Sequence, residues 1–183
     1  GMWAFCWLDE ERGILTAGRD RYGKKPLFYA VEADAIHLAS EPQALAALVG
    51  RPSAMRAGEL DRFMADGWLF PDPSGATHLA GIRELPPGGI LTVDIAAWTI
   101  DVRRGFPMPM DRAAEGEDLA ALLADAVTKR LVSDRKVGLF PSGGIDSTLI
   151  LSVLATLGLT GDVVCITGDA GRTDDARYAS ACI

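Results

Sequence analysis

The feature that most constrains the fold is a glycine-containing turn between a short apolar strand and a helix. The turn is Ser142–Ser147, with the sequence SGGIDS, and it follows the apolar run 137–140. Residues 147–157 carry apolar side chains at helical spacing, and residues 162–167 read as a second strand with two apolar faces, as in parallel sheets. The pattern predicts a β-α-β unit, the opening of a doubly wound α/β fold.

The composition of this turn suits the binding of phosphate groups. Gly143 and Gly144 let the backbone approach a ligand closely, and the N-terminus of the following helix adds partial positive charge. Ser142 and Ser147 supply hydroxyl groups, and Asp146 is a hard oxygen ligand suited to Mg²⁺. The turn is neither a Walker loop nor a dinucleotide fingerprint. From these residues alone, two interpretations stand: a phosphate site, or a tight turn in which Asp146 or Ser142 caps the helix.

The first hundred residues predict a different, antiparallel architecture. Two apolar runs around the polar turn 9–13 indicate a β-hairpin, and later runs indicate further strands. The segments in which we expect strands are 2–8, 14–18, 27–31, 36–39 and 90–93. Ser40 is expected to cap a short helix with an apolar face of Ala44, Leu45, Ala47 and Leu48, and 59–67 is expected to be a helix ended by glycine.

The proline-punctuated stretch 106–112 marks a domain boundary, because it suits neither a helix nor a central strand. We therefore expect a domain at 1–105, a linker at 106–112 and a second domain at 113–183, which opens with an amphipathic helix over 115–132. The expected fold class is α+β in the first part, followed by α/β.

The composition limits the partners and the compartment. A net charge of −7 argues against broad binding to nucleic acid or to anionic membranes. No stretch resembles a membrane span or a signal peptide, and Cys6, Cys165 and Cys182 form no spaced framework. We expect free, buried thiols in a reducing cytoplasm. The charged stretch 19–25 has two interpretations, an anion patch or a charged hairpin end in which Asp20 pairs with an arginine, and we favour the hairpin end.

The chain resembles a known family in five places. VGLFP followed by SGGIDS is similar to the pyrophosphate loop of the N-type ATP pyrophosphatases and, more narrowly, of the asparagine synthetase B family, the glutamine-hydrolysing type. The ordered runs GMWAFCWLDEERG, GRDRYGKKPLFY, LASEPQAL and RELPPGG resemble the second half of that family's glutaminase domain, an antiparallel N-terminal nucleophile hydrolase fold.

The resemblance implies an ATP-dependent ligase that adenylates the side-chain carboxylate of aspartate and forms an amide with ammonia from glutamine. ATP and Mg²⁺ are then the implied cofactors, and a homo-oligomer is expected. Carried over by position, Asp146 would bind the metal and Leu139 would begin the nucleotide wall. Thr167 and Gly168 would meet adenine, and the alternative for this pair is an ordinary strand end. The residues implied for ATP and pyrophosphate are Leu139, Ser142, Gly143, Gly144, Asp146, Ser147, Thr167 and Gly168.

The resemblance also implies that some parts are missing. The family's catalytic cysteine is its first residue, and no position here matches it or the glutamine-binding residues, so no catalytic residue is identified. Cys6 cannot substitute, because its α-amine lies in a peptide bond. We expect the segment alone to be inactive. The alternatives are a truncated, non-catalytic nucleotide-binding or assembly module, and a specialised relative such as a β-lactam synthetase or a lasso-peptide cyclase.

Overall fold

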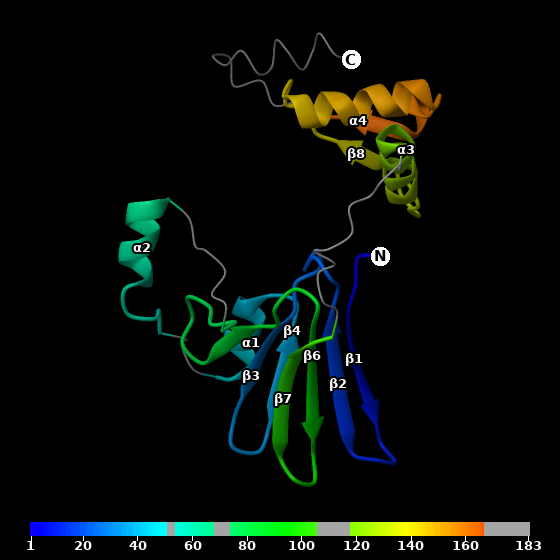
Figure 1. Cartoon of the computed structure of the whole chain (residues 1–183). Coiled ribbons are helices and arrows are strands. Elements are labelled where there is room, and N and C mark those ends of the chain that lie inside the picture. The colour runs from blue at the N-terminus through cyan, green and yellow to red at the C-terminus, as the bar shows by residue number, and fades with distance from the viewer. Residues whose placement is uncertain (51–53, 68–73, 106–117, 167–183) are drawn as a thin grey trace. The chain divides into compact units, whose positions relative to one another are not determined.

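The computed structural model describes residues 1–50, 54–67, 74–105 and 118–166. The chain divides into two compact units, Gly1–Asp111 and Arg112–Ile183, and each is described by itself (Figure 1). The predicted linker 106–112 lies outside the described residues, as does the first part of the helix predicted over 115–132. None of the helices within the described ranges has the length and apolarity needed to cross a bilayer.

The first unit is built on a four-stranded antiparallel sheet with the strand order β1-β2-β6-β7. Its strands are β1 (Ala4–Asp9), β2 (Ile14–Arg19), β6 (Gly89–Asp94) and β7 (Thr99–Arg104). The first two form the predicted hairpin, with Ala4 opposite Arg19 and Asp9 opposite Ile14. β2 pairs on its other side with β6, so two segments far apart in the chain complete the sheet.

A second antiparallel sheet has three strands in the order β4-β3-β5. They are β3 (Phe28–Val31), β4 (Ile36–Ala39) and β5 (Ile82–Glu84). The first two strands were predicted. β5 was not, because three residues with one exposed arginine between Ile82 and Glu84 show no readable alternation.

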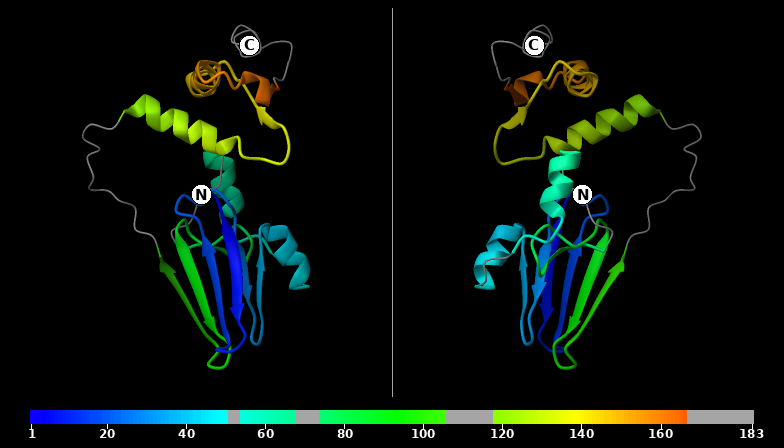
Figure 2. Two further views of the ribbon diagram at one scale, coloured as in Figure 1. Left: turned by 90° about the vertical axis from the view of Figure 1, so that its right-hand side faces the viewer. Right: turned by 90° about the vertical axis from the view of Figure 1, so that its left-hand side faces the viewer.

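The two sheets and one helix form three layers. Figure 2 shows α1 (Pro42–Leu48) on the side of the three-stranded sheet that faces away from the four-stranded sheet. Between α1 and the three-stranded sheet lies a small cluster of Ala30, Leu45 and Ile82. The larger core cluster joins the two sheets, and its buried residues are Ala17, Leu27, Tyr29, Leu85, Leu91 and Val93. The first unit is therefore an α+β fold with its main core between the sheets.

Helix α1 begins one residue later than predicted, and its cap is not Ser40. Glu41 is the N-cap, with extended dihedral angles of −131° and 132° and no side-chain cap bond. The residue before a proline is forced into extended geometry, so Pro42 at the first helical position sets the boundary at Glu41. The predicted apolar face was also wrong in part. Ala44, Ala47 and Leu48 are exposed, whereas Leu45 is fully buried.

Helix α2 (Glu59–Asp66) ends as predicted at Gly67. This glycine has a φ of 75°, in the left-handed region, and its N–H donates to the carbonyl of Phe63 at 2.8 Å. Such a left-handed glycine closes the last turn of a helix with little strain.

Asp20, which we predicted to pair with an arginine at a charged hairpin end, is buried and is bound by backbone N–H groups. Its side chain is 1% exposed, and its carboxylate accepts backbone N–H groups from Trp3, Tyr22, Lys24 and Lys25 at 2.9–3.3 Å. Burial by itself raises the pKa of Asp20, but the four N–H donors together lower the pKa to about 2. The carboxylate fixes the loop after β2, because it accepts N–H groups of loop residues that have no partner in a β-sheet.

The neighbouring Arg19 is also buried. Its guanidinium donates to the carbonyls of Lys25, Gly23 and Leu85 at 2.6–2.9 Å, and it pairs with Glu84 at 2.6 Å. A rigid guanidinium can serve several acceptors at once. Arg19 therefore ties the end of β2 to the segment that follows β5.

The second unit contains the predicted β-α-β arrangement. Its elements are α3 (Leu119–Arg130), β8 (Val137–Leu139), α4 (Ile145–Thr156), the 3-10 turn η1 (Thr160–Asp162) and β9 (Val163–Cys165). β8 and β9 pair in parallel, with Val137 opposite Val163 and Leu139 opposite Cys165. The parallel unit is confirmed, and the described sheet has these two strands.

Cys6 is exposed, so the prediction of a buried thiol was wrong for this residue. β1 lies at an edge of its sheet, and an edge strand has no neighbour on one side to cover its side chains. Cys165 is half-buried in β9, and Cys182 lies outside the described residues.

Candidate functional site

The turn that carries the predicted phosphate chemistry lies between β8 and α4. Pro141 is buried, and the chain then turns through Ser142 and Gly143. Gly143 has a φ of 74°, which only glycine adopts without strain. Gly144 follows as the N-cap of α4, with extended dihedral angles of −77° and 166° and no side-chain cap bond. The N-cap position is therefore held by a glycine and not by Asp146 or Ser142, although the hydroxyl oxygen of Ser142 accepts the N–H of Gly144.

Ser142 and Ser147 hold the turn together. Their hydroxyl oxygens are 3.2 Å apart, and the N–H of Ser142 donates to Oγ of Ser147 at 3.1 Å. The hydroxyl of Ser147 in turn donates to the carbonyl of Gly144 at 3.3 Å. The N–H of Gly144 donates to Oγ of Ser142 at 3.4 Å. The turn is thus closed by its own serines, although most of its residues face solvent.

The first turn of α4 leaves donors free for a ligand. Ile145, Asp146 and Ser147 are its first three residues, and N–H groups at these positions have no partner within a helix. Together with the helix dipole, they favour an anion at this end. The exposed Asp146 is the acidic residue of that turn. An anion bound there needs a cation to offset this carboxylate.

The remaining predicted residues lie at the same edge of the small sheet or outside the described ranges. Leu139 ends β8 and is half-buried, and its carbonyl accepts the N–H of Ile166 at 2.9 Å. Because β8 and β9 are parallel, their carboxyl ends share one edge, which is where α/β sheets bind ligands. Thr167 and Gly168 follow directly in the sequence, but they lie outside the described residues.

Asp146 is not part of a cluster of metal-ligating side chains among the described residues. Within the described ranges, no three histidine, cysteine or acidic side chains come together. Mg²⁺ commonly uses one or two carboxylates and completes its shell with water and substrate phosphates. A single exposed carboxylate beside free helix N–H groups fits a metal that arrives with a polyphosphate.

Cys6 is not a good nucleophile in this structure. Although Cys6 as a whole residue is exposed, partial burial of its sulfur raises the pKa of the thiol, which disfavours the reactive thiolate. Within the described ranges, the side chain of Cys6 makes no hydrogen bond to a base.

One cavity was not predicted from the sequence. It is a cleft of about 730 Å³ in the first unit, between β7 on one side and β3 and β5 on the other. Its lining residues are Tyr29, Val31, Ser74, Gly81, Arg83, Pro86, Ile100, Val102, Arg103 and Arg104. These residues come from three separate stretches of the chain, so no local sequence motif predicts the cleft.

Comparison with known families assigns both halves of the chain. Residues 1–103 match the family described as glutamine amidotransferase domain, and residues 118–183 match the family described as asparagine synthase. The first match covers more than half of the chain.

Named relatives are glutamine-hydrolysing asparagine synthetases. Asparagine synthetase [glutamine-hydrolyzing] 3 of Bacillus subtilis strain 168 is 32% identical over 162 residues, which cover 85% of this chain and 25% of that protein. The human asparagine synthetase [glutamine-hydrolyzing] is 30% identical over 155 residues, covering 84% of this chain and 27% of that protein. Asparagine synthetase [glutamine-hydrolyzing] 2 of Bacillus subtilis strain 168 is 27% identical over 195 residues, which cover 98% of this chain and 26% of that protein.

The chain thus spans about a quarter of the length of these relatives. The matched families follow one another in the same order as the two units of the structure. On this evidence the chain belongs to the glutamine amidotransferase family of the asparagine synthetase type.

Proposed function

We propose that the turn Ser142–Ser147 binds the phosphates of ATP in a glutamine-dependent ligase that forms an amide on aspartate. The observation that carries the proposal is the left-handed Gly143 placed directly before the free N-terminus of α4, at the carboxyl edge of two parallel strands. The match of this segment to the asparagine synthase family supports the assignment.

The proposed roles divide between phosphate, metal and base. Ser142, Gly143, Gly144 and Ser147 hold pyrophosphate through hydroxyl and N–H donors, and the ligand replaces the hydrogen bonds that the serines make within the turn. Asp146 binds Mg²⁺. The base and sugar lie toward Leu139, Thr167 and Gly168. When bound, ATP supplies the adenylyl group that activates the acceptor carboxylate and the pyrophosphate that leaves. The chain's own contribution is to neutralise the charge of that leaving group.

The proposed organisation of the whole protein follows the sequence. Residues 1–105 belong to the glutaminase domain, 106–112 form a linker, and 113–183 belong to the ATP-binding domain, in which β8 and β9 are part of a doubly wound parallel sheet. Glutamine supplies the ammonia, and the protein acts in the cytoplasm as a homo-oligomer.

Calorimetric titration of the 183-residue chain with pyrophosphate in the presence of Mg²⁺ tests the phosphate site. We expect saturable binding, and we expect Asp146→Asn to weaken it by roughly tenfold, as for loss of one charged ligand. Asp162→Asn is the matched control, because Asp162 is an exposed aspartate of the same unit, in η1. Equal affinity of both variants, or no saturation, would rule the site out.

The acceptor is tested separately in a protein that contains the complete ATP-binding domain. ATP–pyrophosphate exchange is expected with aspartate and not with other carboxylates. Exchange with a different acid would replace aspartate but leave the phosphate site intact.

A further inference from the structure

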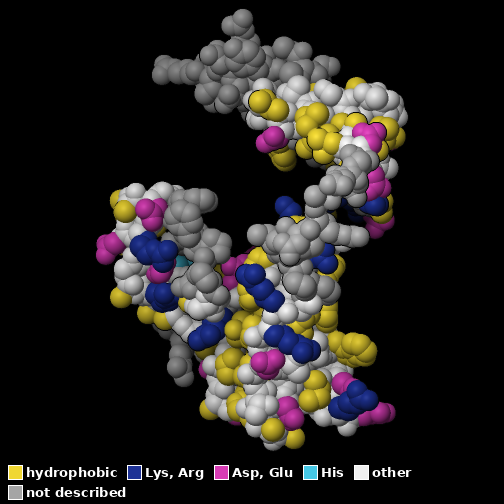
Figure 3. All heavy atoms as spheres, in the orientation of Figure 1, with side chains coloured by type: hydrophobic (Ala, Val, Ile, Leu, Met, Phe, Trp, Pro, Cys, Tyr) yellow, Lys and Arg dark blue, Asp and Glu magenta, His cyan; other side chains and the backbone are white. Residues whose placement is uncertain are grey.

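The cleft between β7 and the β3–β5 pair has an unusual charge. The chain carries a net charge of −7, yet three of the ten residues that line this cleft are arginines and none is acidic. In the space-filling view, basic side chains gather around the end of β7 (Figure 3). The cleft is therefore a local positive site on an acidic protein.

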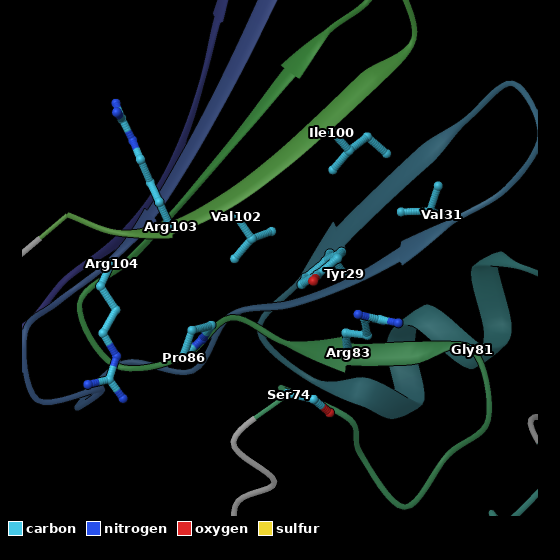
Figure 4. Close-up of a pocket in the computed structure, with 10 residues that line it drawn as sticks. All are labelled: Tyr29, Val31, Ser74, Gly81, Arg83, Pro86, Ile100, Val102, Arg103 and Arg104. Carbon is cyan, nitrogen blue, oxygen red and sulfur yellow. The ribbon is translucent and has the colours of Figure 1, made fainter.

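Arg83, one of the arginines that line the cleft, has no counter-ion among the described residues. Arg83 lies opposite Tyr29 across the β3–β5 ladder, and neither side chain makes a hydrogen bond or ion pair within the described ranges. The adjacent carboxylate of Glu84 is already engaged by Arg19 at 2.6 Å. Figure 4 shows Arg83 and Tyr29 at one end of the cleft, and Arg103 and Arg104 on β7 at the other.

Tyr29 supplies an independent sign of a ligand. The residue is 6% exposed, because its ring belongs to the core cluster between the sheets. Its hydroxyl nevertheless has no hydrogen-bond partner in the described part of the chain. Every fully buried side-chain oxygen of the described residues does have a partner, so the unpaired Tyr29 oxygen must be accessible to solvent. The phenol hydroxyl of Tyr29 is therefore an unpaired donor in the lining of the cleft, and a bound ligand can accept its hydrogen bond.

The walls between these polar groups are apolar. Ile100 and Val102 come from β7, and Val31 and Pro86 complete the wall. The cleft of about 730 Å³ is large enough for a small organic molecule, and its lining offers both polar groups and apolar surface.

We propose that this cleft binds a small organic anion, whose carboxylate or phosphate head group is held by Arg83 and Tyr29 and whose apolar body lies on Ile100 and Val102. The guanidinium binds both oxygens of such a head group through parallel N–H donors, and the phenol donates a third hydrogen bond. Arg104 adds attraction from the far end of the cleft. The proposal concerns the first unit alone and does not depend on the phosphate site at α4.

The test is a titration of the ¹⁵N-labelled 183-residue chain followed by amide chemical shifts. The probes are phenyl phosphate and phenylacetate, which carry the two head groups on one apolar ring, with benzyl alcohol as the neutral analogue. We expect saturable shifts in β3, β5 and β7 with one or both anions, and binding at least about tenfold weaker for the alcohol.

Variants locate the site. Arg83→Gln is expected to weaken the anion by about tenfold and Tyr29→Phe by a few fold, with the fold intact because Arg83 is exposed. Arg12→Gln is the matched control, since Arg12 is an exposed arginine in the turn after β1. Unchanged affinity in Arg83→Gln, or equal binding of benzyl alcohol, would overturn the proposal.

Two further outcomes would also overturn it. Inorganic phosphate binding as tightly as phenyl phosphate would show that the apolar walls take no part. Shifts of the cleft residues with protein concentration alone would show that a segment of a second copy fills the cleft instead.

Discussion

Asp20 is a buried carboxylate that stabilises a loop through backbone donors. We expect Asp20→Asn to lower the free energy of unfolding by about 3 kcal/mol, because an amide nitrogen cannot accept the N–H groups that now point at it. Urea denaturation at neutral pH measures the loss. Asp9→Asn is the control: Asp9 accepts one N–H from the exposed Arg12, and its replacement should cost less than about 1 kcal/mol. Equal losses would show that the buried carboxylate has no special role.

The same carboxylate predicts a dependence of stability on pH. The pKa of Asp20 is lowered from 3.8 to about 2, so the folded state binds a proton less readily than the unfolded state. The stabilisation is therefore complete above about pH 4 and is lost as the pH falls toward 2. Melting temperatures of the wild type and Asp20→Asn should converge over that window. A constant difference between them would contradict the assignment.

Gly75 provides a test of a close backbone contact. It has a φ of 76°, and a Cβ atom there would lie 2.4 Å from the carbonyl oxygen of Glu84. We expect Gly75→Ala to lower the free energy of unfolding by about 3 kcal/mol, because the Cβ atom causes both a backbone clash and strain in the left-handed conformation. Gly13→Ala is matched in φ at 65° but meets nothing within 4 Å, so it should cost about 1 kcal/mol. Thermal unfolding of both variants makes the comparison, and similar costs would exclude the clash.

At the level of single residues, the sequence predicted chemistry better than environment. The glycine pair and the hydroxyl groups of the turn lie together as expected, because they are neighbours in the chain. Asp20 was not placed correctly, although three of its four N–H donors lie within five residues of it in the chain. Arg83 was not noticed, since the cleft around it is assembled from β3, β5 and β7. A charged residue in a polar stretch looks solvated until the fold brings donors around it.

At the scale of elements, β1 is an apolar strand at a sheet edge. Phe5, Trp7 and Leu8 are 42%, 70% and 43% exposed, and an unpaired edge offers free backbone groups to another chain. We expect Trp7→Lys to reduce self-association, measured by light scattering over a range of concentrations. Leu48→Lys replaces a side chain that is 62% exposed on α1, outside the four-stranded sheet, and should leave association unchanged. Association that is equal in both variants would point to another surface.

Element types were predictable where the pattern was long or carried turn residues. The hairpin, the glycine end of α2 and the parallel β-α-β unit follow from alternation, from Gly67 and from apolar strands around a helix. The start of α1 was missed by one residue because the geometry before Pro42 outweighed the capping preference of Ser40. β5 is held by pairing with β3 and not by its own sequence.

At the scale of the whole molecule, the two units differ in core size. Of the buried hydrophobic residues in the described ranges, nine lie in the first unit, and two, Val127 and Leu154, lie in the second. We expect amides of β2 and β6 to exchange hydrogen far more slowly than those of β8 and β9. Hydrogen–deuterium exchange read by mass spectrometry measures this. Comparable protection in both pairs of strands would mean that the small core does not set local stability.

The pairing of β2 with β6 also fixes an order of events during synthesis. The chain must add all of β3, β4, α1, α2 and β5 before Gly89–Asp94 exists to meet Ile14–Gly18. Until then the β1–β2 hairpin leaves the ribosome with the inner side of β2 uncovered, and Leu15 and Ala17 have no core to enter. A nascent chain of this sequence is therefore most prone to misassembly in the interval before β6 emerges, and slower translation through that interval would lengthen the exposure.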